Sequence, residues 1–238
     1  MKNKISCLIP AAGKGSRTGL TYPKTLYKIN SLPIIVRILK NINHLDAKPT
    51  IIINNKFLFL FRSTLNNYKF SAEFIQQRYP RGMGNAIIQF IKSKKFIKTN
   101  HILLIWGDVP FLRKTSLDKL INFHLKNNND FSLITKFVKD PYTIVNRNSS
   151  GKIVSVIETK LFPKKKIKYG EREIGVFIFK KNLIINLLKK NLSKKYYKKE
   201  HGFLYLIKHL VNLGYKVEAL PIANNKEIIS FNSINDLK

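Results

Sequence analysis

The stretch from Leu8 to Leu26 has the sequence LIPAAGKGSRTGLTYPKTL, and it decides the fold that we expect. An apolar strand, Ile5–Ile9, leads into two alanines and then into the glycine-rich, basic segment Gly13–Arg17. Glycine lets a backbone turn tightly and bring its N–H groups close to an anion. A strand that delivers such a loop to its carboxyl end is typical of phosphate binding in α/β proteins.

Three cations in this stretch strengthen the phosphate interpretation: Lys14, Arg17 and Lys24, the last in a Pro-Lys pair. The spacing matches neither the P-loop nor the dinucleotide-binding fingerprint. A plain strand-to-helix connection with incidental lysines would explain Gly-Lys-Gly alone, but it explains the whole string poorly. We therefore expect a phosphate-binding loop.

Helix-like and strand-like segments alternate through the first half of the chain. Apolar spacing predicts helices over 33–43, 56–65, 84–91 and 116–125, and strands over 50–53, 72–76 and 101–106. The last of these strands, HILLIW, is continuously apolar, as expected of a strand covered on both faces. The alternation predicts an α/β protein with a doubly wound, mainly parallel (mixed) sheet.

The second half is less regular, but it shows no internal repeat and no convincing linker. Its pattern predicts strands over 131–138, 143–145, 153–157, 173–179 and 216–220, helices over 183–188, 202–213 and from 233, and a loop over 162–170. At 238 residues the chain is long enough for one sizeable core. We expect a single domain over residues 1–238.

Composition narrows the cellular context. The chain is 44% hydrophobic, so it should fold. No apolar run approaches the roughly 20 residues that span a bilayer, and the amino terminus lacks a signal-peptide pattern. The single cysteine, Cys7, lies within the first strand and is expected to be a buried, inert thiol. These features favour a cytoplasmic protein.

The formal net charge of +31 is unusual. It could indicate a nucleic-acid or anionic-membrane partner. However, the lysines are scattered, and Lys, Asn and Ile, whose codons are all A/T-rich, are all abundant, so codon bias is the preferred explanation. We expect small-molecule partners and neither nucleic acid nor membrane, and the oligomeric state stays open.

Several polar residues stand where strands are expected to end. Asp108 follows HILLIW within Gly-Asp-Val-Pro, where open α/β sheets bind ligands, and a lone carboxylate near phosphates suits Mg²⁺. Gln77 could pair with a base edge and Gly82 could let a flat ring approach, although, taken alone, these residues are better explained by an ordinary polar loop. Glu158 and Glu173 could accept hydrogen bonds from sugar hydroxyls, or pair with lysines such as Lys160 or Lys168.

These motifs, in this order, resemble the nucleotidyltransferase superfamily that activates sugar phosphates. Within it they most resemble the uridylyltransferase domains of bacterial N-acetylglucosamine-1-phosphate uridylyltransferases. The family's A-A-G-x-G-[ST]-R, followed by P-K, is similar to residues 11–17 and 23–24, and its Y/N-G-D-V-P is similar to residues 106–110. EREIGVFIF (171–179) resembles E-I-N-T-G-I-Y-V-F, and SFNSINDL (230–237) resembles G-V-N-N-R-L-Q-L.

The resemblance covers nearly the whole chain and implies a Rossmann-like fold and transfer of a nucleoside monophosphate from an NTP, with UTP favoured, to a sugar 1-phosphate. It implies Mg²⁺ as the cofactor, held by Asp108 and by Asn232, for which a helix-capping role is the alternative. Lys14, Arg17 and Lys24 would bind the reacting phosphates. The implied nucleotide contacts are Ala11, Ala12, Gly13, Gly15, Ser16, Gln77, Gly82 and Met83, and the implied sugar contacts are Glu158, Glu173 and Tyr142.

Three positions depart from the family pattern, all at the base and acceptor ends of the site. Glu173 falls where the family has Asn, Tyr142 where it has Gly, and Met83 where it has Thr. The β-helix acetyltransferase domain of the bifunctional members is not found in this sequence, so no acetyl transfer is expected. The opening LIPAAGKGSR also resembles cytidylyltransferases that act on alcohol phosphates, so CTP stays an alternative. A basic nucleic-acid-binding protein is a more distant alternative.

Overall fold

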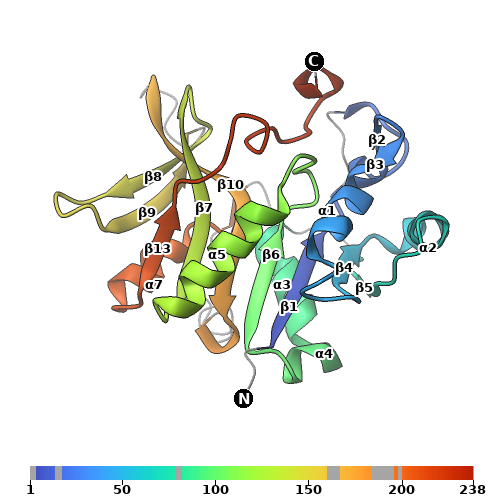
Figure 1. The fold of residues 1–238 in the computed structure, drawn as a ribbon, viewed down its shortest axis with the longest axis horizontal. Coiled ribbons are helices and arrows are strands. Elements are labelled where there is room, and N and C mark those ends of the chain that lie inside the picture. The colour runs from blue at the N-terminus through green and yellow to red at the C-terminus, as the bar shows by residue number, and fades with distance from the viewer. Residues whose placement is uncertain are drawn as a thin grey trace.

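The structure is a computed structural model, and it describes residues 4–13, 18–78, 82–159, 167–183, 196–197 and 200–237. In this part of the chain, seven strands form the main sheet in the order β13-β7-β10-β6-β1-β4-β5 (Figure 1). Their bounds are β1 Ile5–Pro10, β4 Thr50–Ile53, β5 Glu73–Gln76, β6 His101–Ile105, β7 Phe131–Lys139, β10 Tyr169–Lys180 and β13 Val217–Leu220.

The sheet is mixed, as the sequence predicted. β1 pairs in parallel with β4 and β6, β4 with β5, and β13 with β7. Only β10 runs antiparallel to its two neighbours, β6 and β7, within the described sheet. Because the carboxyl ends of β1, β4, β5 and β6 meet at one edge, the loops that follow these strands lie together there.

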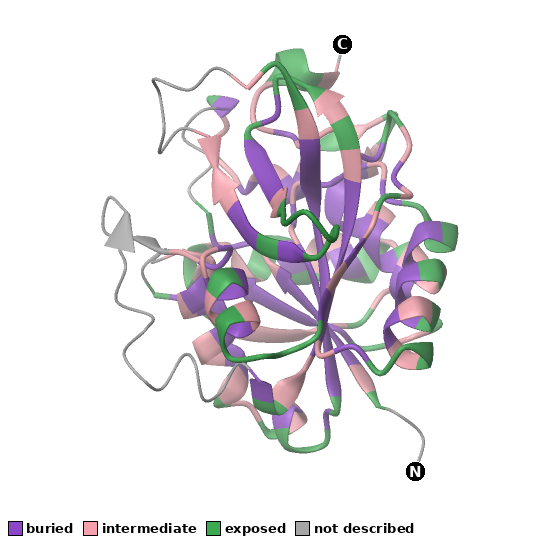
Figure 2. Cartoon of the chain, turned by 90° about the vertical axis from the view of Figure 1, so that its left-hand side faces the viewer, coloured by how far each residue is buried: buried purple, intermediate pink, exposed green. Residues whose placement is uncertain are grey.

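Helices cover both faces of the sheet. α1 (Ile34–Ile42), α2 (Leu58–Asn67) and α5 (Lys114–Lys126) pack in one apolar cluster, and α3 (Met83–Ile91), α4 (Lys94–Ile97) and α7 (Leu206–Asn212) pack in the other. Alternate residues of β1 divide between them: Cys7 and Ile9 belong to the first cluster and Leu8 to the second. This is the two-residue period of a strand covered on both sides, and Figure 2 shows buried residues running along the strands.

Shorter elements complete the fold. They are the 3₁₀ helices η2 (Lys24–Leu26), η3 (Asn55–Phe57) and η6 (Ile234–Leu237), and the paired strands β2 (Lys28–Ile29) with β3 (Leu32–Pro33), β8 (Thr143–Arg147) with β9 (Ile153–Glu158), and β11 (Tyr196–Tyr197) with β12 (Glu200–His201). Large aromatic side chains are buried in the core, among them Phe131, Phe177 and Phe179. In the described part of the chain, no helix is long and apolar enough to cross a bilayer.

The predicted elements within the described residues are present, but two of them differ clearly in extent and one short helix was not predicted. β10 begins at Tyr169 and so includes the end of the predicted loop, because its first residues pair with β7 although they are polar. α7 covers only 206–212 of the predicted 202–213. The short helix α4 was not predicted; the side chain of Ser93 caps its first turn. The helix predicted over 183–188 lies almost wholly outside the described residues.

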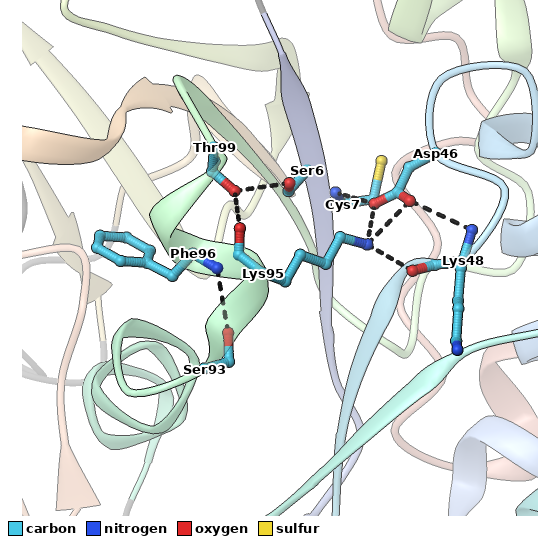
Figure 3. A network of polar contacts seen from close by, with 8 residues as sticks. All are labelled: Ser6, Cys7, Asp46, Lys48, Ser93, Lys95, Phe96 and Thr99. Carbon is cyan, nitrogen blue, oxygen red and sulfur yellow. Dashed lines mark hydrogen bonds and ion pairs between the residues drawn. The ribbon is translucent and has the colours of Figure 1, made fainter.

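A polar network links helix α4 to the amino-terminal end of β1, opposite the edge where the loops after β1, β4, β5 and β6 lie (Figure 3). The ammonium group of Lys95 donates to both carboxylate oxygens of Asp46, at 2.9 and 2.6 Å, and Asp46 accepts from the backbone N–H of Cys7. Cys7 is fully buried, as expected, and burial raises the pKa of its thiol. This network is structural, because it lies at the amino-terminal end of β1.

Candidate active site

The loop after β1 begins in the core and then opens to solvent. Ala11 and Ala12 are buried, and the N–H of Ala11 continues the sheet by donating to Ile52 at 2.7 Å. Gly13 is exposed, and a Cβ added there would meet no atom within 4 Å. Residues 14–17 lie outside the described part of the chain, so the roles expected of Lys14, Gly15, Ser16 and Arg17 stay predictions.

Lys24 brings three of the predicted site residues together. Its Nζ lies 2.6 Å from Oδ2 of Asp108 and 3.4 Å from Oδ1 of Asn232. It also donates to the backbone carbonyl of Phe231 at 3.0 Å. Asp108 and Asn232 lie 84 and 208 residues after Lys24 in the sequence. Nothing in the local sequence required this meeting, so it is a property of the tertiary fold.

Asp108 is held at the edge of the sheet by close packing around Gly107. A Cβ on Gly107 would lie 2.6 Å from the Thr25 side chain and 2.8 Å from the Pro10 carbonyl. The backbone N–H of Trp106 donates to Gly175 on β10 at 2.8 Å. The loop from β6 is therefore pressed against both β1 and the helical turn that carries Lys24.

One oxygen of the Asp108 carboxylate is not used within the part of the chain that the structure describes. Oδ2 accepts from Lys24, but Oδ1 is buried and has no hydrogen-bond partner among the described residues. No group of three or more His, Cys, Asp or Glu side chains that could hold a metal occurs in this part of the chain. One carboxylate, one amide oxygen and a nearby polyphosphate are nevertheless the hard oxygen ligands that suit Mg²⁺, which keeps few protein ligands.

Asn232 does not act as a helix cap here. Its side-chain oxygen faces Lys24, and its side-chain NH₂ lies 3.4 Å from the Ser230 carbonyl. The first turn of η6 is held instead by Asp236, which accepts from the backbone N–H groups of Asn232 and Ser233 at 2.7 and 2.6 Å. The Asn232 amide oxygen is thus directed toward Lys24, which also contacts Asp108.

Gln77 and Gly82 lie together after β5. The side-chain NH₂ of Gln77 donates to the Gly82 carbonyl at 3.2 Å and to Oδ1 of Asn85 at 2.8 Å. Gly82 has φ of +85° at the start of α3, a backbone conformation that favours glycine, and Met83 is the first residue of that helix. Asn85 was not predicted; it lies three residues after Gly82, and this helical spacing directs it back to Gln77.

At the opposite side, Glu173 is fully buried beside β8. Its carboxylate accepts hydrogen bonds from the hydroxyl of Thr143 at 3.2 Å and from the backbone N–H of Gly175. Burial raises the pKa of Glu173 to about 7, and the nearby negative charge of Asp108 acts in the same direction. The suggested pairing with Lys168 is not seen among the described residues. Glu158 ends β9 directly opposite Thr143.

Tyr142 contacts two residues near the site, Arg172 and Ser230. The guanidinium carbon of Arg172 lies 3.7 Å from the centre of its ring, and its hydroxyl lies 3.4 Å from Oγ of Ser230. Burial, and secondarily the charge of Glu173, raises the pKa of the phenol. Arg172 was not predicted as a site residue, and its only signal was its place beside Glu173.

An open α/β sheet whose strands deliver a glycine-rich loop, a lysine and a lone carboxylate to one edge has the architecture of a nucleotidyltransferase domain. The chain belongs to the family described as MobA-like NTP transferase domains, whose model matches residues 7–157.

Sequence relatives agree with this assignment. The bifunctional protein GlmU of Buchnera aphidicola subsp. Schizaphis graminum is 31% identical over 242 residues, which cover 98% of this chain and 49% of that protein. GlmU of Thermodesulfovibrio yellowstonii is 27% identical over 240 residues, covering 98% of this chain and 50% of that protein. The chain thus spans about half the length of the curated relatives it matches.

Two solved structures share the fold. A Bacillus anthracis protein assigned as a glucose-1-phosphate thymidylyltransferase superposes with a TM-score of 0.72 at 17% identity, covering 92% of this chain and 87% of that one. A 4-diphosphocytidyl-2C-methyl-D-erythritol synthase from Anaerococcus prevotii gives 0.67 at 15% identity, covering 98% and 94%. At these identities the likeness establishes the fold alone.

Proposed function

We propose that this domain transfers a nucleoside monophosphate from an NTP, with UTP favoured, to a sugar 1-phosphate and releases pyrophosphate. The observation that supports this most directly is the meeting of Lys24, Asp108 and Asn232 at the carboxyl edge of the sheet. A cation beside a carboxylate and an amide oxygen provides the charges that bind phosphates and a divalent metal.

The chemistry requires little beyond positioning and charge. A sugar phosphate is already ionised near neutral pH, so its oxygen attacks the α-phosphorus without a general base, and pyrophosphate leaves in line. Lys24 neutralises the charge that builds up between the two phosphates. Lys14 and Arg17 hold the leaving pyrophosphate, for which the planar guanidinium group of arginine is well suited.

Asp108 and Asn232 are the residues that would hold Mg²⁺. Oδ1 of Asp108, which has no partner among the described residues, and the Asn232 oxygen, which shares Lys24 with Asp108, are suitable donors. When bound, the ion reduces the repulsion between the α-phosphate and the incoming phosphate.

Base and acceptor recognition fall to the two sides of this centre. Gln77 and Gly82 select the pyrimidine, since their mutual hydrogen bond holds the amide of Gln77 beside a glycine that a flat ring can approach. We assign nucleotide contacts to the buried Ala11 and Ala12, the exposed Gly13, and to Gly15, Ser16 and Met83. Glu158 and Tyr142 would contact the acceptor, whereas Glu173, the third residue expected there, is fully buried in this structure.

A cytidylyltransferase that acts on an alcohol or sugar phosphate is the second candidate. The LIPAAGKGSR opening supports it, and one structure with this fold is a cytidyl-transferring synthase by its name. Both candidates share the phosphate chemistry and differ in base and acceptor.

The deciding experiment incubates the purified protein with each NTP and a panel of sugar 1-phosphates and alcohol phosphates, and measures pyrophosphate. We expect release with UTP and a sugar 1-phosphate and none when Mg²⁺ is removed by EDTA. Release only with CTP would favour the second candidate. No release with any pair, together with a salt-dependent gel shift on nucleic acid, would contradict both.

A further inference from the structure

Arg172 is a buried cation on β10 next to Glu173, and its guanidinium group is held by three partners. It is 9% exposed. Its Nη2 donates to the Ile228 carbonyl at 3.2 Å, and its Nε donates to the Glu173 carbonyl at 3.3 Å. Its face lies over the ring of Tyr142, with 3.7 Å between Cζ and the ring centre. An arginine that stacks on an aromatic ring and donates two hydrogen bonds is held in one defined position.

The segment that Arg172 holds carries the proposed metal ligand. Residues 228–232 form no helix and no strand, so their position depends on individual contacts. Just upstream, Glu227 is anchored by Arg113, whose Nε donates to it at 2.9 Å. Within the segment, Phe231 is fully buried, and its N–H donates to the backbone carbonyl of Asp108 at 2.8 Å.

Between these two anchors, the Arg172–Tyr142 pair ties the segment to the β8–β10 side. Arg172 holds the carbonyl of Ile228, and the hydroxyl of Tyr142 lies 3.4 Å from Oγ of Ser230. Because Tyr142 is itself stacked under Arg172, removing the guanidinium group loosens both contacts at once. Two residues further on, Asn232 presents its amide oxygen to Lys24.

We propose that Arg172, stacked on Tyr142, is a positioning residue that fixes the 228–232 segment and thereby places Asn232 against Asp108 and Lys24. It acts through the segment and need not touch substrate. The importance of Arg172 for catalysis rests on the proposed nucleotidyl transfer. Its effect on the conformation of residues 228–232 does not depend on that function.

The test compares Arg172→Met, which keeps the aliphatic stem, with Arg172→Lys, which keeps the charge. The matched control is Arg147→Met on β8. Arg147 pairs with the buried Glu171 at 2.7 Å and donates to the Gly151 carbonyl, so its loss should lower stability without loosening residues 228–232.

The first readout is hydrogen–deuterium exchange of the substrate-free protein, which needs no turnover. In Arg172→Met we expect faster exchange at residues 228–232, including the Phe231 amide, and little change at the stretch anchored by Glu227. Arg147→Met should leave exchange at 228–232 unchanged. Unaltered exchange in Arg172→Met, or equal loosening in Arg147→Met, would overturn the proposal. If Arg172→Met does not fold, Tyr142→Leu is compared with the control by the same measurement.

The second readout is kinetic. Losing a group that orients a metal ligand costs about 10- to 100-fold in metal affinity or activity. We therefore expect Arg172→Met to lower kcat and raise the Mg²⁺ midpoint by such a factor while KM for the NTP changes little, and Arg172→Lys to recover part of the loss. A changed NTP KM with an unchanged Mg²⁺ midpoint would overturn the positioning role. A wild-type protein inactive with every substrate pair would overturn the proposed function, while exchange would still decide the role of Arg172.

Discussion

The ammonium group of Lys24 lies 2.6 Å from Oδ2 of Asp108, and both side chains are only about a fifth exposed or less. The lysine therefore neutralises the carboxylate before any substrate phosphate arrives. The other oxygen of Asp108 has no partner among the described residues. One carboxylate thus holds a fixed cation on one side and offers a free lone pair on the other.

Asp108→Asn should abolish Mg²⁺-dependent turnover while the fold remains intact, because the residue lies at the end of a strand. Such a change can cost several kcal/mol of transition-state stabilisation. Pyrophosphate release and the far-UV circular dichroism spectrum measure the two effects. Wild-type turnover in a folded Asp108→Asn protein would show that the metal assignment is wrong.

Lys24→Ala should lower kcat more than it weakens NTP binding. The reason is that Nζ lies among Asp108, Asn232 and the Phe231 carbonyl, where charge shifts during attack rather than on binding alone. Steady-state kinetics and equilibrium binding of the NTP separate the two. An effect confined to NTP affinity would show that Lys24 interacts equally with the bound NTP and with the transition state.

Gly107→Ala should destabilise the protein by about 1–3 kcal/mol, which is typical of overpacking a rigid site. The added Cβ would lie 2.6 Å from the Thr25 side chain and 2.8 Å from the Pro10 carbonyl, and backbone cannot yield cheaply. Urea unfolding measures the loss. Gly13→Ala is the matched control, because its Cβ meets no atom of the described residues within 4 Å, and equal stability of the two variants would contradict this packing.

Glu173→Gln should become more stable relative to wild type as the pH rises from about 4.5 to about 7. Burial raises the pKa of Glu173 from 4.5 to about 7, so the folded wild-type protein binds the proton more tightly and loses stability across this window. Glutamine does not titrate, and the gain should reach up to about 3 kcal/mol. Urea midpoints of both proteins at pH 5 and pH 8 test this. The same difference at both pH values would place the Glu173 pKa near its ordinary value.

The double variant Glu173→Asn, Tyr142→Gly should change the choice of acceptor. An asparagine side chain always carries an NH₂ donor, whereas a glutamate donates a hydrogen bond only when it is protonated, and the tyrosine ring fills space that a glycine leaves open. The measurement is the ratio of kcat/KM for N-acetylglucosamine 1-phosphate to that for glucose 1-phosphate. An unchanged ratio would mean that these residues do not set acceptor choice.

Local signals in the sequence were enough for most of the fold. The continuous apolar run before Trp106 predicted a buried strand, and β6 is buried at all five positions. β10 was less visible, because its first residues are polar and form a strand only through pairing with β7. A polar residue in such a position has no local pattern, so its conformation is decided by its partner.

The same division applies to the candidate site. The sequence by itself determined which residue types stand at the strand ends: a glycine-rich basic loop, Lys24, Asp108 and Gln77. Only the tertiary structure decided that Asn232 turns toward Lys24 instead of capping η6, and that Glu173 is buried between Thr143 and Gly175. Arg172 became visible only there, because its partners Tyr142 and Ile228 lie 30 and 56 residues away, and spacing along the chain carries no information about such contacts.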